Sequence, residues 1–272
     1  MNMSTTTKLT KLVAQLIITG EIELLTGLRI GGSETGLSIG GVDTVVIRNA
    51  TDGKPYIPGS SLKGKMRCLL EKVYCPGKLS DVANSRIFTC DSLETYNNPK
   101  KGIIFHLFGT TNEEIKKLKN DGNTYLIDYS LPTRLIVRDC SLTNDSAKKL
   151  EESLYVDLPY TQAKTEVVID RITSAATPRK IERVPAGVKF NYQIVLNIYD
   201  PPDLKDEWLS SSLNTLKEGM DLLENDYLGG MGSRGYGQIK FATRKVKLNN
   251  LTEDTNLEQN MIYTQWLNTF QR

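Results

Sequence analysis

The sequence has a single histidine, four cysteines and no long apolar run, and each scarcity argues against a class of protein. A Ser-His-Asp triad or a two-histidine ribonuclease would have to be built on His106, whose neighbours in IIFHLFG are apolar. Four cysteines in 272 residues do not support a disulfide framework, so we expect reduced thiols in a cytoplasmic protein. No apolar run reaches about 18 residues, which excludes a transmembrane helix. The polar start MNMSTTTKLT indicates a lead into a strand and no signal peptide.

Net charge is also small, because 34 basic residues stand against 32 acidic ones and leave only +2. Nucleic-acid binding therefore cannot be argued from bulk charge and has to come from local clusters. At 39% hydrophobic residues, the chain can bury a sizeable core.

Apolar–polar alternation predicts strands, and apolar stripes at spacings of three and four predict helices. The expected strands are 16–24, 134–140, 188–199 and 236–248, and the expected helices are 61–74 and 212–227. The last strand shifts phase between Phe241 and Val246, which predicts a bulge. The order strand, helix, strand, strand, helix, strand is ferredoxin-like and is also that of an RNA recognition module. The sequence therefore predicts an α+β fold with a βαββαβ core.

We expect one domain over 1–272, whose core lies in about 12–30, 60–74, 133–141 and 188–248. Long insertions at 31–58, 75–132 and 141–187 interrupt this core, and loops of such length are usually functional. The stretch 257–270 is expected to form an amphipathic helix that docks on the core.

The segment IPGSSLKGKMR places three cations near the start of the first predicted helix. Lys63 and Arg67 are four residues apart on one flank, Lys65 lies on the other, and Gly64 leaves room for close backbone approach. Cations at a helix N-terminus oppose the helix dipole, and a bound anion would relieve that cost and use the free N–H groups. The segment is consistent with a phosphate site, and a solvated basic helix is the alternative.

The run GGMGSRGYG, from Gly229 to Gly237, matches GxGxxG in its glycine spacing. A helix precedes it and a strand follows it, which is the reverse of a dinucleotide-binding turn. A Walker phosphate loop also fails, because Tyr236 stands where lysine is needed. What remains is a helix-to-strand loop whose N–H groups can approach a phosphate backbone, with Arg234 in it. The alternative is a helix C-cap with an elaborate turn.

The stretch TEVVIDRITSAATPRKIERVP (165–185) predicts a projecting hairpin, because two β-prone arms flank a small polar tip at 173–178. Its basic residues are Arg171, Arg179, Lys180 and Arg183. A mixed-charge exposed ribbon is the alternative.

Two further candidates are a lone carboxylate and a scattered set of metal-binding residue types. Asp43 lies in the glycine-flanked loop SIGGVDTVVI, where an aspartate is usually a turn residue. Cys75, Cys90 and His106 fall in one insertion and could bind zinc, although their spacing matches no compact knuckle. A buried histidine and scattered thiols are the favoured interpretation.

Taken in order, these motifs resemble the RAMP superfamily, and most closely the repeated backbone subunit of the type III-A Csm complex of CRISPR interference. The resemblance rests on TGLRIGG, IGGVD, IPGSSLKGKMR, HLFG, the stretch 170–183 and DYLGGMGSRGYG, and it spans Gly20 to about Lys240. It implies an RRM-like core with a lid and a thumb-like hairpin, stacked head to tail with copies of itself along CRISPR RNA. Such subunits assemble with other Csm subunits, hold the guide and cut the target RNA paired to it.

The resemblance also assigns roles to residues. Asp43 matches the catalytic aspartate, and the hairpin around 172–181 matches the thumb that displaces a nucleotide. Arg29 stands where some relatives have histidine, and it is expected to contact RNA. The residues expected to contact RNA are Arg29, Lys63, Lys65, Arg67, Arg171, Ile172, Arg179, Arg183, Gly230, Gly232, Ser233, Arg234 and Gly235.

The implied chemistry is metal-assisted endonuclease cleavage. A displaced nucleotide brings its 2′-OH in line with the adjacent phosphate, and Mg²⁺ or another divalent cation held by Asp43 and substrate phosphates neutralises the developing charge. The main alternative is a RAMP backbone subunit that only binds guide RNA. A stand-alone guide-processing endonuclease and a nucleotide-binding enzyme are further alternatives, disfavoured by the scarcity of histidine and by the context of the glycines.

Overall fold

The computed structural model describes residues 10–32, 45–75, 80–82, 85–87, 98, 100–110, 133–200 and 206–252. The strands are β1 (Lys11–Leu24), β2 (Tyr56–Ile57), β3 (Ser80–Val82), β4 (Ser85–Ile87), β5 (Leu135–Val137), β6 (Cys140–Leu142), β7 (Gln162–Ile169), β8 (Ala176–Arg183), β9 (Lys189–Asp200) and β10 (Ile239–Asn250). The helices are α1 (Gly59–Tyr74), α3 (Lys101–Phe108), α6 (Asn144–Glu151), α7 (Asp206–Glu224) and the 3-10 turn η1 (Gly232–Arg234).

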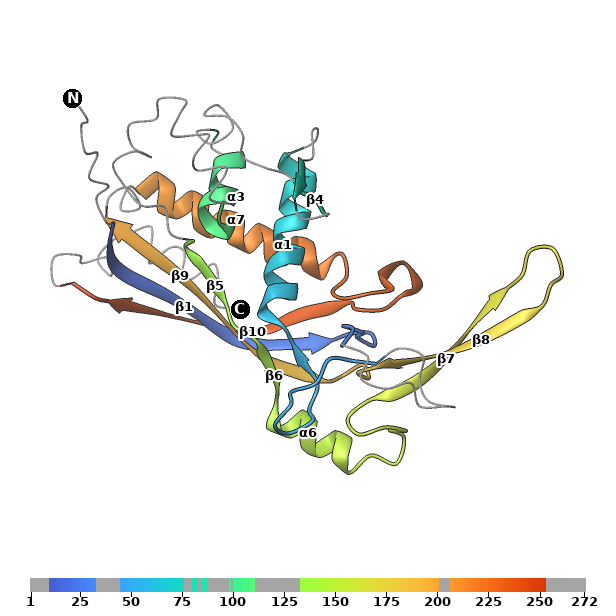
Figure 1. Ribbon diagram of the computed structural model, residues 1–272. Helices are drawn as coiled ribbons and strands as arrows, with labels where there is room; N and C mark the ends of the chain where they lie inside the picture. Colours follow the sequence, from blue (N-terminus) through green and yellow to red (C-terminus); the bar gives the residue numbers. More distant parts are fainter. Residues whose placement is uncertain are drawn as a thin grey trace, which may run out of the picture.

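One antiparallel sheet forms the centre of the protein, in the order β10-β1-β9-β6-β2, with β5 also paired to β9. Helices α1, α3 and α7 lie together on one face of this sheet (Figure 1). Along the chain the core runs β1, α1, β5 with β6, β9, α7 and β10. The predicted α+β fold and its βαββαβ order are therefore confirmed.

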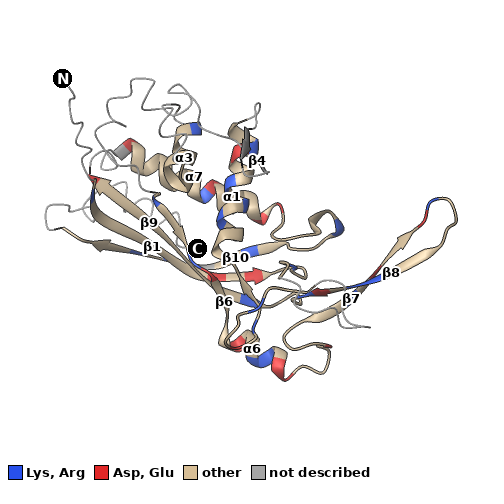
Figure 2. Ribbon diagram, in the orientation of Figure 1, with Lys and Arg blue, Asp and Glu red and all other residues tan. Residues whose placement is uncertain are grey.

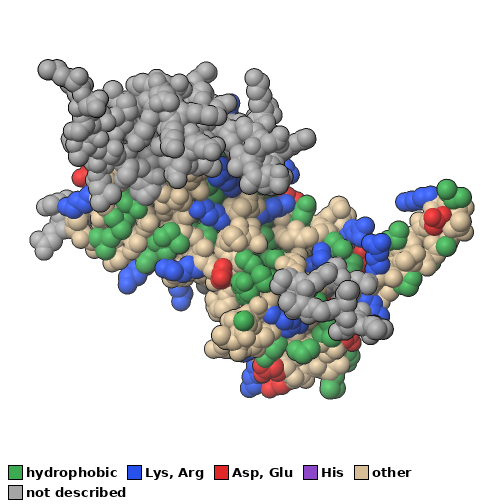
Figure 3. Space-filling model, viewed as in Figure 1, with side chains coloured by type: hydrophobic (Ala, Val, Ile, Leu, Met, Phe, Trp, Pro, Cys, Tyr) green, Lys and Arg blue, Asp and Glu red, His purple; other side chains and the backbone are tan. Residues whose placement is uncertain are grey.

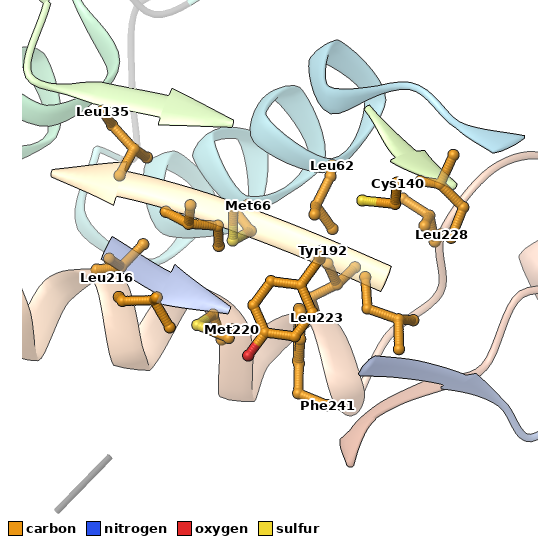
Figure 4. Packing of buried hydrophobic residues seen from close by; sticks show 14 of the residues in the cluster. Leu62, Met66, Leu135, Cys140, Tyr192, Leu216, Met220, Leu223, Leu228 and Phe241 are labelled. Atoms are coloured by element: carbon orange, nitrogen blue, oxygen red, sulfur yellow. The ribbon is translucent and has the colours of Figure 1, made fainter. Parts of the chain in front are cut away.

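The core forms where the apolar faces of the strands and helices meet (Figure 4). In β1 the alternation works as predicted, because Leu16, Ile18 and Ile22 are buried and the residues between them are less so. Helices α1 and α7 come close at Gly219, where a Cβ would lie 3.1 Å from the Leu70 Cδ1. Each buried aliphatic side chain contributes about 1.5–3 kcal/mol. This packing fixes α1 on the sheet and leaves its polar flanks facing outward.

The strand predicted over 134–140 is broken into β5 and β6. At the break, Arg138 N–H donates to Gln193 O (3.1 Å) and the Asp139 carboxylate accepts from Gly59 N–H (2.8 Å) at the start of α1. The chain leaves the ladder because Asp139 caps the helix, a long-range contact that no local pattern contains. The predicted bulge in β10 is confirmed, since Glu21 pairs with Thr243 while Ile22 pairs with Phe241.

The predicted hairpin is present as β7 and β8, which form a two-stranded sheet of their own and project from the body of the protein (Figure 1). Its turn lies at 170–175, three residues earlier than the predicted tip at 173–178. At its base, Leu28 and Val184 exchange two backbone hydrogen bonds of 3.0 and 2.8 Å.

One predicted insertion and the C-terminal stretch differ in how far the structure describes them. The insertion predicted at 75–132 contains α3, which packs against α1 and α7. The helix expected at 257–270 lies outside the described residues. Within the described part of the chain, no helix has the length and apolar character needed to cross a membrane.

Candidate nucleic-acid interface

Lysine and arginine residues recur along α1, on the loop after α7 and on the β7–β8 hairpin (Figure 2). We call Gly229–Gly237 the glycine loop, and residues 25–32, which follow β1, the entry segment. The two pack together, because Gly230 N–H donates to Arg29 O (2.9 Å) and Gly237 N–H donates to Gly27 O (3.0 Å). The structure therefore brings Arg29 beside the glycine loop.

The glycine loop has a tightly packed inner part and an exposed outer part. At Gly229, with φ +77°, a Cβ would lie 2.3 Å from Arg29 O, and at Gly232 it would lie 1.9 Å from the Tyr227 Cγ. These glycines are needed for internal packing. Residues Ser233, Arg234 and Gly235 form the exposed outer part of the loop. Of the predicted RNA contacts in the loop, these three are the most accessible to a phosphate backbone.

Lys65 lies between α1 and the glycine loop. Its Nζ is 3.0 Å from the Asp226 carboxylate and 3.6 Å from the centre of the Tyr227 ring, and Tyr227 packs on Gly232. The side chain is 16% exposed. Lys65 therefore joins α1 to the glycine loop, and its predicted contact with guide RNA stays a prediction.

Lys63 and Arg67 share one flank of α1, as predicted, and both already bind backbone carbonyl groups. Lys63 Nζ donates to Leu135 O (2.9 Å), and Arg67 donates to Gly109 O (3.1 Å) and to the Glu71 carboxylate (2.6 Å). Burial, and then the charge of Arg67, lower the pKa of Lys63. Each side chain keeps further N–H donors, so the two cations are held in place beside each other and can still contact a phosphate.

The start of α1 already has an anion, which is the carboxylate of Asp139 on the Gly59 N–H (2.8 Å). The sequence pattern predicted that an anion would favour this helix N-terminus, and the chain supplies one itself. A Cβ at Gly59 would lie 2.2 Å from Val137 O, so the turn before β6 packs directly on the helix start. RNA phosphates would therefore approach the side-chain flank of α1 and not the Gly59 N–H.

The base of the hairpin contacts the glycine loop through Tyr236. The Arg183 guanidinium lies over the Tyr236 ring at 5.2 Å, and a Cβ at Gly27 would lie 2.6 Å from the Arg183 Cδ. Arg234 pairs with the Glu166 carboxylate of β7 at 3.0 Å, with its side chain still 56% exposed. Arg29, Arg183 and Arg234 therefore gather around one loop, although they are far apart in sequence.

Sequence reasoning missed the residues that connect the hairpin to the glycine loop. In the sequence Tyr236 argues only against a Walker lysine, yet it is 1% exposed and Lys164 Nζ lies 4.8 Å from its ring centre. Burial, followed by the nearby Glu166 carboxylate, raises the pKa of Tyr236 to about 12, so the hydroxyl stays protonated. The sequence offered one signal for this contact, which is the aromatic Tyr236 between two glycines. Such an arrangement suggests that the loop folds over the ring and buries it.

The tip of the hairpin presents Ile172, which is 94% exposed, together with exposed Arg171. Hydrophobic and basic side chains lie together on the surface of the projecting hairpin (Figure 3). The Asp170 carboxylate holds this turn, because it accepts from Ile172 N–H (2.9 Å), Thr173 N–H (2.6 Å) and the Thr173 hydroxyl (2.9 Å). These hydrogen bonds lower the pKa of Asp170. An apolar side chain with this exposure on an ordered turn is available to insert between bases.

Asp43 lies outside the described residues, as does the rest of 33–44. The chain before that segment pairs with the chain after it: Gly32 N–H donates to Val45 O (3.1 Å) and Ile47 N–H donates to Ile30 O (2.9 Å). The two flanks are therefore paired beside Arg29. The catalytic role of Asp43 stays a prediction.

The zinc expectation also stays a prediction. Cys90 lies outside the described residues, and no group of three His, Cys, Asp or Glu residues in the described part of the chain could hold a metal ion. His106 sits edge-on to Trp208 at 6.2 Å, and burial, with a smaller effect of Arg134, lowers its pKa to about 3. Burial raises the pKa of Cys75 to about 11. His106 is half-buried and stays neutral at this low pKa, so it is poorly suited to accept a proton near neutral pH.

A groove of about 480 Å³ lies on the sheet, and its lining includes Thr19, Glu21, Arg138, Gln193 and Lys245. None of the predicted RNA contacts lines it. Its tyrosine, Tyr192, is 3% exposed and packs edge-on against Phe241 at 5.2 Å. The groove therefore lacks the exposed aromatic rings with which an RNA recognition module stacks bases.

A family model described as the RAMP superfamily matches residues 21–240, which include the entry segment, α1, the hairpin and the glycine loop. The chain belongs to the RAMP superfamily. All the predicted RNA contacts lie inside the matched residues.

Among RAMP proteins, the chain is similar to those named "CRISPR system Cms endoribonuclease Csm3". The one from Methanothermobacter thermautotrophicus is 40% identical over 231 residues, which are 85% of this chain and 85% of the relative. The one from Streptococcus thermophilus is 38% identical over 233 residues, which are 86% of this chain and 90% of the relative. The crystal structure of Methanopyrus kandleri Csm3 has a TM-score of 0.56 at 24% identity, over 87% of this chain and 78% of that one, and supports the fold alone.

The RAMP glycine loop offers a matched pair of stability variants. Gly237 has φ +77° and a Cβ there would lie 2.0 Å from Leu228 O, whereas Gly235 has φ +84° with nothing within 4 Å. We expect Gly237→Ala to lower the free energy of unfolding by about 3 kcal/mol, through backbone strain and overpacking. Gly235→Ala should lower it by about 1 kcal/mol, through strain alone. Urea unfolding measures both, and equal decreases would contradict the assigned contact with Leu228.

Proposed function

We propose that this chain is the CRISPR RNA-binding backbone subunit of a type III-A Csm interference complex, and that it is also a metal-dependent endoribonuclease. It binds guide RNA, pairs with copies of itself head to tail and with other Csm subunits, and cuts guide-paired target RNA in the cytoplasm. The observation that carries the proposal is the clustering of Arg29, Arg183 and Arg234 around the glycine loop, at the hairpin base. The endoribonuclease name of relatives matched over 85% of both chains agrees with it.

The chain's own residues divide the work of binding. Arg234 and the exposed outer part of the glycine loop offer a guanidinium and backbone N–H groups to phosphates, which bind RNA without reading its sequence. Lys63 and Arg67 extend this surface along α1. Ile172, an exposed apolar residue at the tip of the hairpin, would displace one nucleotide from the strand. Cleavage would then depend on geometry, with weak sequence preference.

Asp43 is the residue proposed to hold the metal ion. The carboxylates described near the site are already paired, Glu166 with Arg234 and Glu182 with Arg48, so neither is a free ligand. Magnesium commonly takes one or two carboxylates and completes its shell with water and substrate phosphates, and it would neutralise the charge that develops on the cleaved phosphate. One aspartate therefore fits this donor set. The chain's part is to align the 2′-OH with the adjacent phosphate.

The proposal is tested by purifying the chain from its host and identifying the RNA and proteins that accompany it. We expect guide RNAs of one family and other complex subunits. Recovery of the chain without RNA would contradict the proposed backbone role. The alternative, a RAMP subunit that only holds guide RNA, is separated by target cleavage, which that alternative lacks.

Removal of divalent cations tests the metal requirement. With EDTA, we expect cleavage of guide-paired RNA to stop and binding of guide and target to persist, because the phosphates are held mainly by protein cations. Adding Mg²⁺ back should restore cleavage. Gel assays of binding and cutting in the same samples measure both, and an unchanged cleavage rate in EDTA would remove the metal from the mechanism.

A further inference from the structure

A buried carboxylate, that of Glu182 in β8, joins three separate segments at the base of the hairpin. Glu182 is 3% exposed. Its Oε2 accepts from Val46 N–H (2.7 Å), and its Oε1 accepts from Arg48 Nη2 (2.6 Å) and from the Thr161 hydroxyl (2.5 Å). Both oxygen atoms are therefore engaged, one by the backbone after residues 33–44 and the other by two side chains.

Arg48 completes this network with two further hydrogen bonds. Its Nη2 also donates to the Thr161 Oγ1 (2.9 Å), and its Nη1 donates to Gly53 O (2.8 Å). Thr161, which comes directly before β7, is fully buried. The network thus links β8, the start of β7 and the turn before β2 through polar groups that are paired with each other.

The network lies where the chain leaves the segment that contains Asp43, and a neighbouring backbone pairing lies on the side where the chain approaches that segment. Val46, held by Glu182, is three residues after Asp43 in the sequence. On the other side of the segment, Leu28 exchanges two backbone hydrogen bonds with Val184, two residues after Glu182. Strand β8 and the residue that follows it therefore hold both flanks of residues 33–44, one through the backbone and the other through the Glu182 side chain.

Stability alone does not account for a carboxylate in this place. Apolar residues of similar size often replace a buried ion pair without loss of stability, because burying charge is costly. What a buried, fully hydrogen-bonded carboxylate adds is a fixed direction for every donor around it. Here the donors belong to the hairpin base and to the chain after Asp43, which are the parts that cleavage has to align.

We propose that Glu182 is a positioning residue for RNA cleavage, which fixes the hairpin relative to the chain on both sides of residues 33–44. This inference rests on the proposed function. Glu182 itself contacts no RNA, and it acts by keeping the nucleotide displaced by the hairpin in line with the catalytic group.

The test is Glu182→Gln in the reconstituted complex, with target affinity and single-turnover cleavage measured separately. We expect guide binding and target affinity to be unchanged and the cleavage rate to fall by about 10- to 100-fold, the range that small misplacements cause. Glu218→Gln is the matched control, because Glu218 also accepts a hydrogen bond, from the Tyr74 hydroxyl (2.5 Å) in the helix layer. Cleavage at the wild-type rate, or a parallel decrease of affinity and rate, would overturn the inference.

Two more variants test the network, one by a milder change and the other by combining two changes. Thr161→Val removes one donor to Glu182 and keeps the side-chain shape, so it should slow cleavage less than Glu182→Gln, with affinity again unchanged. Arg48→Met combined with Glu182→Gln should be no slower than the slower single variant, because the two residues act as one unit. Fully additive effects on the rate would overturn the inference.

Asp43→Ala, assayed in parallel, separates the positioning role of Glu182 from the proposed function. If Asp43→Ala still cuts target RNA, the proposed catalytic residue is wrong. If Asp43→Ala is inactive and Glu182→Gln cuts normally, the positioning role of Glu182 alone is wrong.

Discussion

Asp43→Ala is expected to assemble with guide RNA as the unaltered chain does and to leave paired target RNA uncut. The described binding surface is built from Arg29, the glycine loop and the hairpin base, and none of its contacts requires the Asp43 carboxylate. The metal ion would lose the carboxylate that is proposed to hold it, and in-line positioning alone would not neutralise the phosphate charge. A gel assay with labelled target RNA measures the uncut fraction.

The control is Asp52→Ala. Asp52 is an exposed aspartate whose carboxylate accepts from Lys54 N–H (3.1 Å) in the turn before β2. This variant should assemble and cut at the unaltered rate. Continued cutting by Asp43→Ala would assign catalysis to another residue, and failure of Asp43→Ala to bind guide RNA would make its role structural.

The second large effect is expected from removing the paired cations of α1. Lys63→Ala combined with Arg67→Ala should weaken guide RNA binding and reduce the slope of log K against log salt by about one for each phosphate that the protein no longer neutralises. The reason is that both side chains are held in place by backbone carbonyls, Leu135 O and Gly109 O, and so need little reordering to meet a phosphate. Filter binding over a salt series measures the slope.

Lys72→Ala is the matched control for this pair, because Lys72 is an exposed lysine in the last turn of the same helix. The Lys72→Ala variant should bind guide RNA with nearly unchanged affinity and salt slope, because it removes only one charge that lies away from the proposed interface. If the double variant keeps the full slope, Lys63 and Arg67 face solvent or protein in the complex, and the α1 flank is not part of the interface.

The sequence predicts the framework well because local periodicity governs it. The alternation in β1 and the stripes of α1 and α7 arise from one face of each element meeting the core, and that face is visible in the sequence. The bulge in β10 was predictable for the same reason, since a phase shift needs an extra residue.

One of the misses comes from a contact between distant segments, and the other comes from side-chain hydrogen bonds within a turn. The strand expected over 134–140 is broken because Asp139 caps α1, 80 positions away in the chain. The tip of the hairpin is displaced because the Asp170 carboxylate collects three donors and starts the turn early. The amino-acid composition of these segments alone decides neither the strand break nor the position of the turn.

The candidate site also combines features that local sequence patterns reveal with features that arise only on folding. The glycine loop and the α1 cations could be singled out from their motifs. Their partners could not, because the Asp226 carboxylate beside Lys65 and the Glu166 carboxylate beside Arg234 meet them only after folding. In the sequence Glu182 is one charge of a mixed ribbon, whereas folding buries it under three hydrogen-bond donors.

The cleavage mechanism is best tested by mapping the products when the purified complex meets an RNA that matches its guide and one that does not. We expect cuts only in the matched RNA, within the paired region, that leave 2′,3′-cyclic phosphate and 5′-hydroxyl ends, because the 2′-OH attacks the adjacent phosphate. Equal cutting of the unmatched RNA, or 5′-phosphate ends from direct attack by water, would show that guide-directed attack by the 2′-OH is wrong.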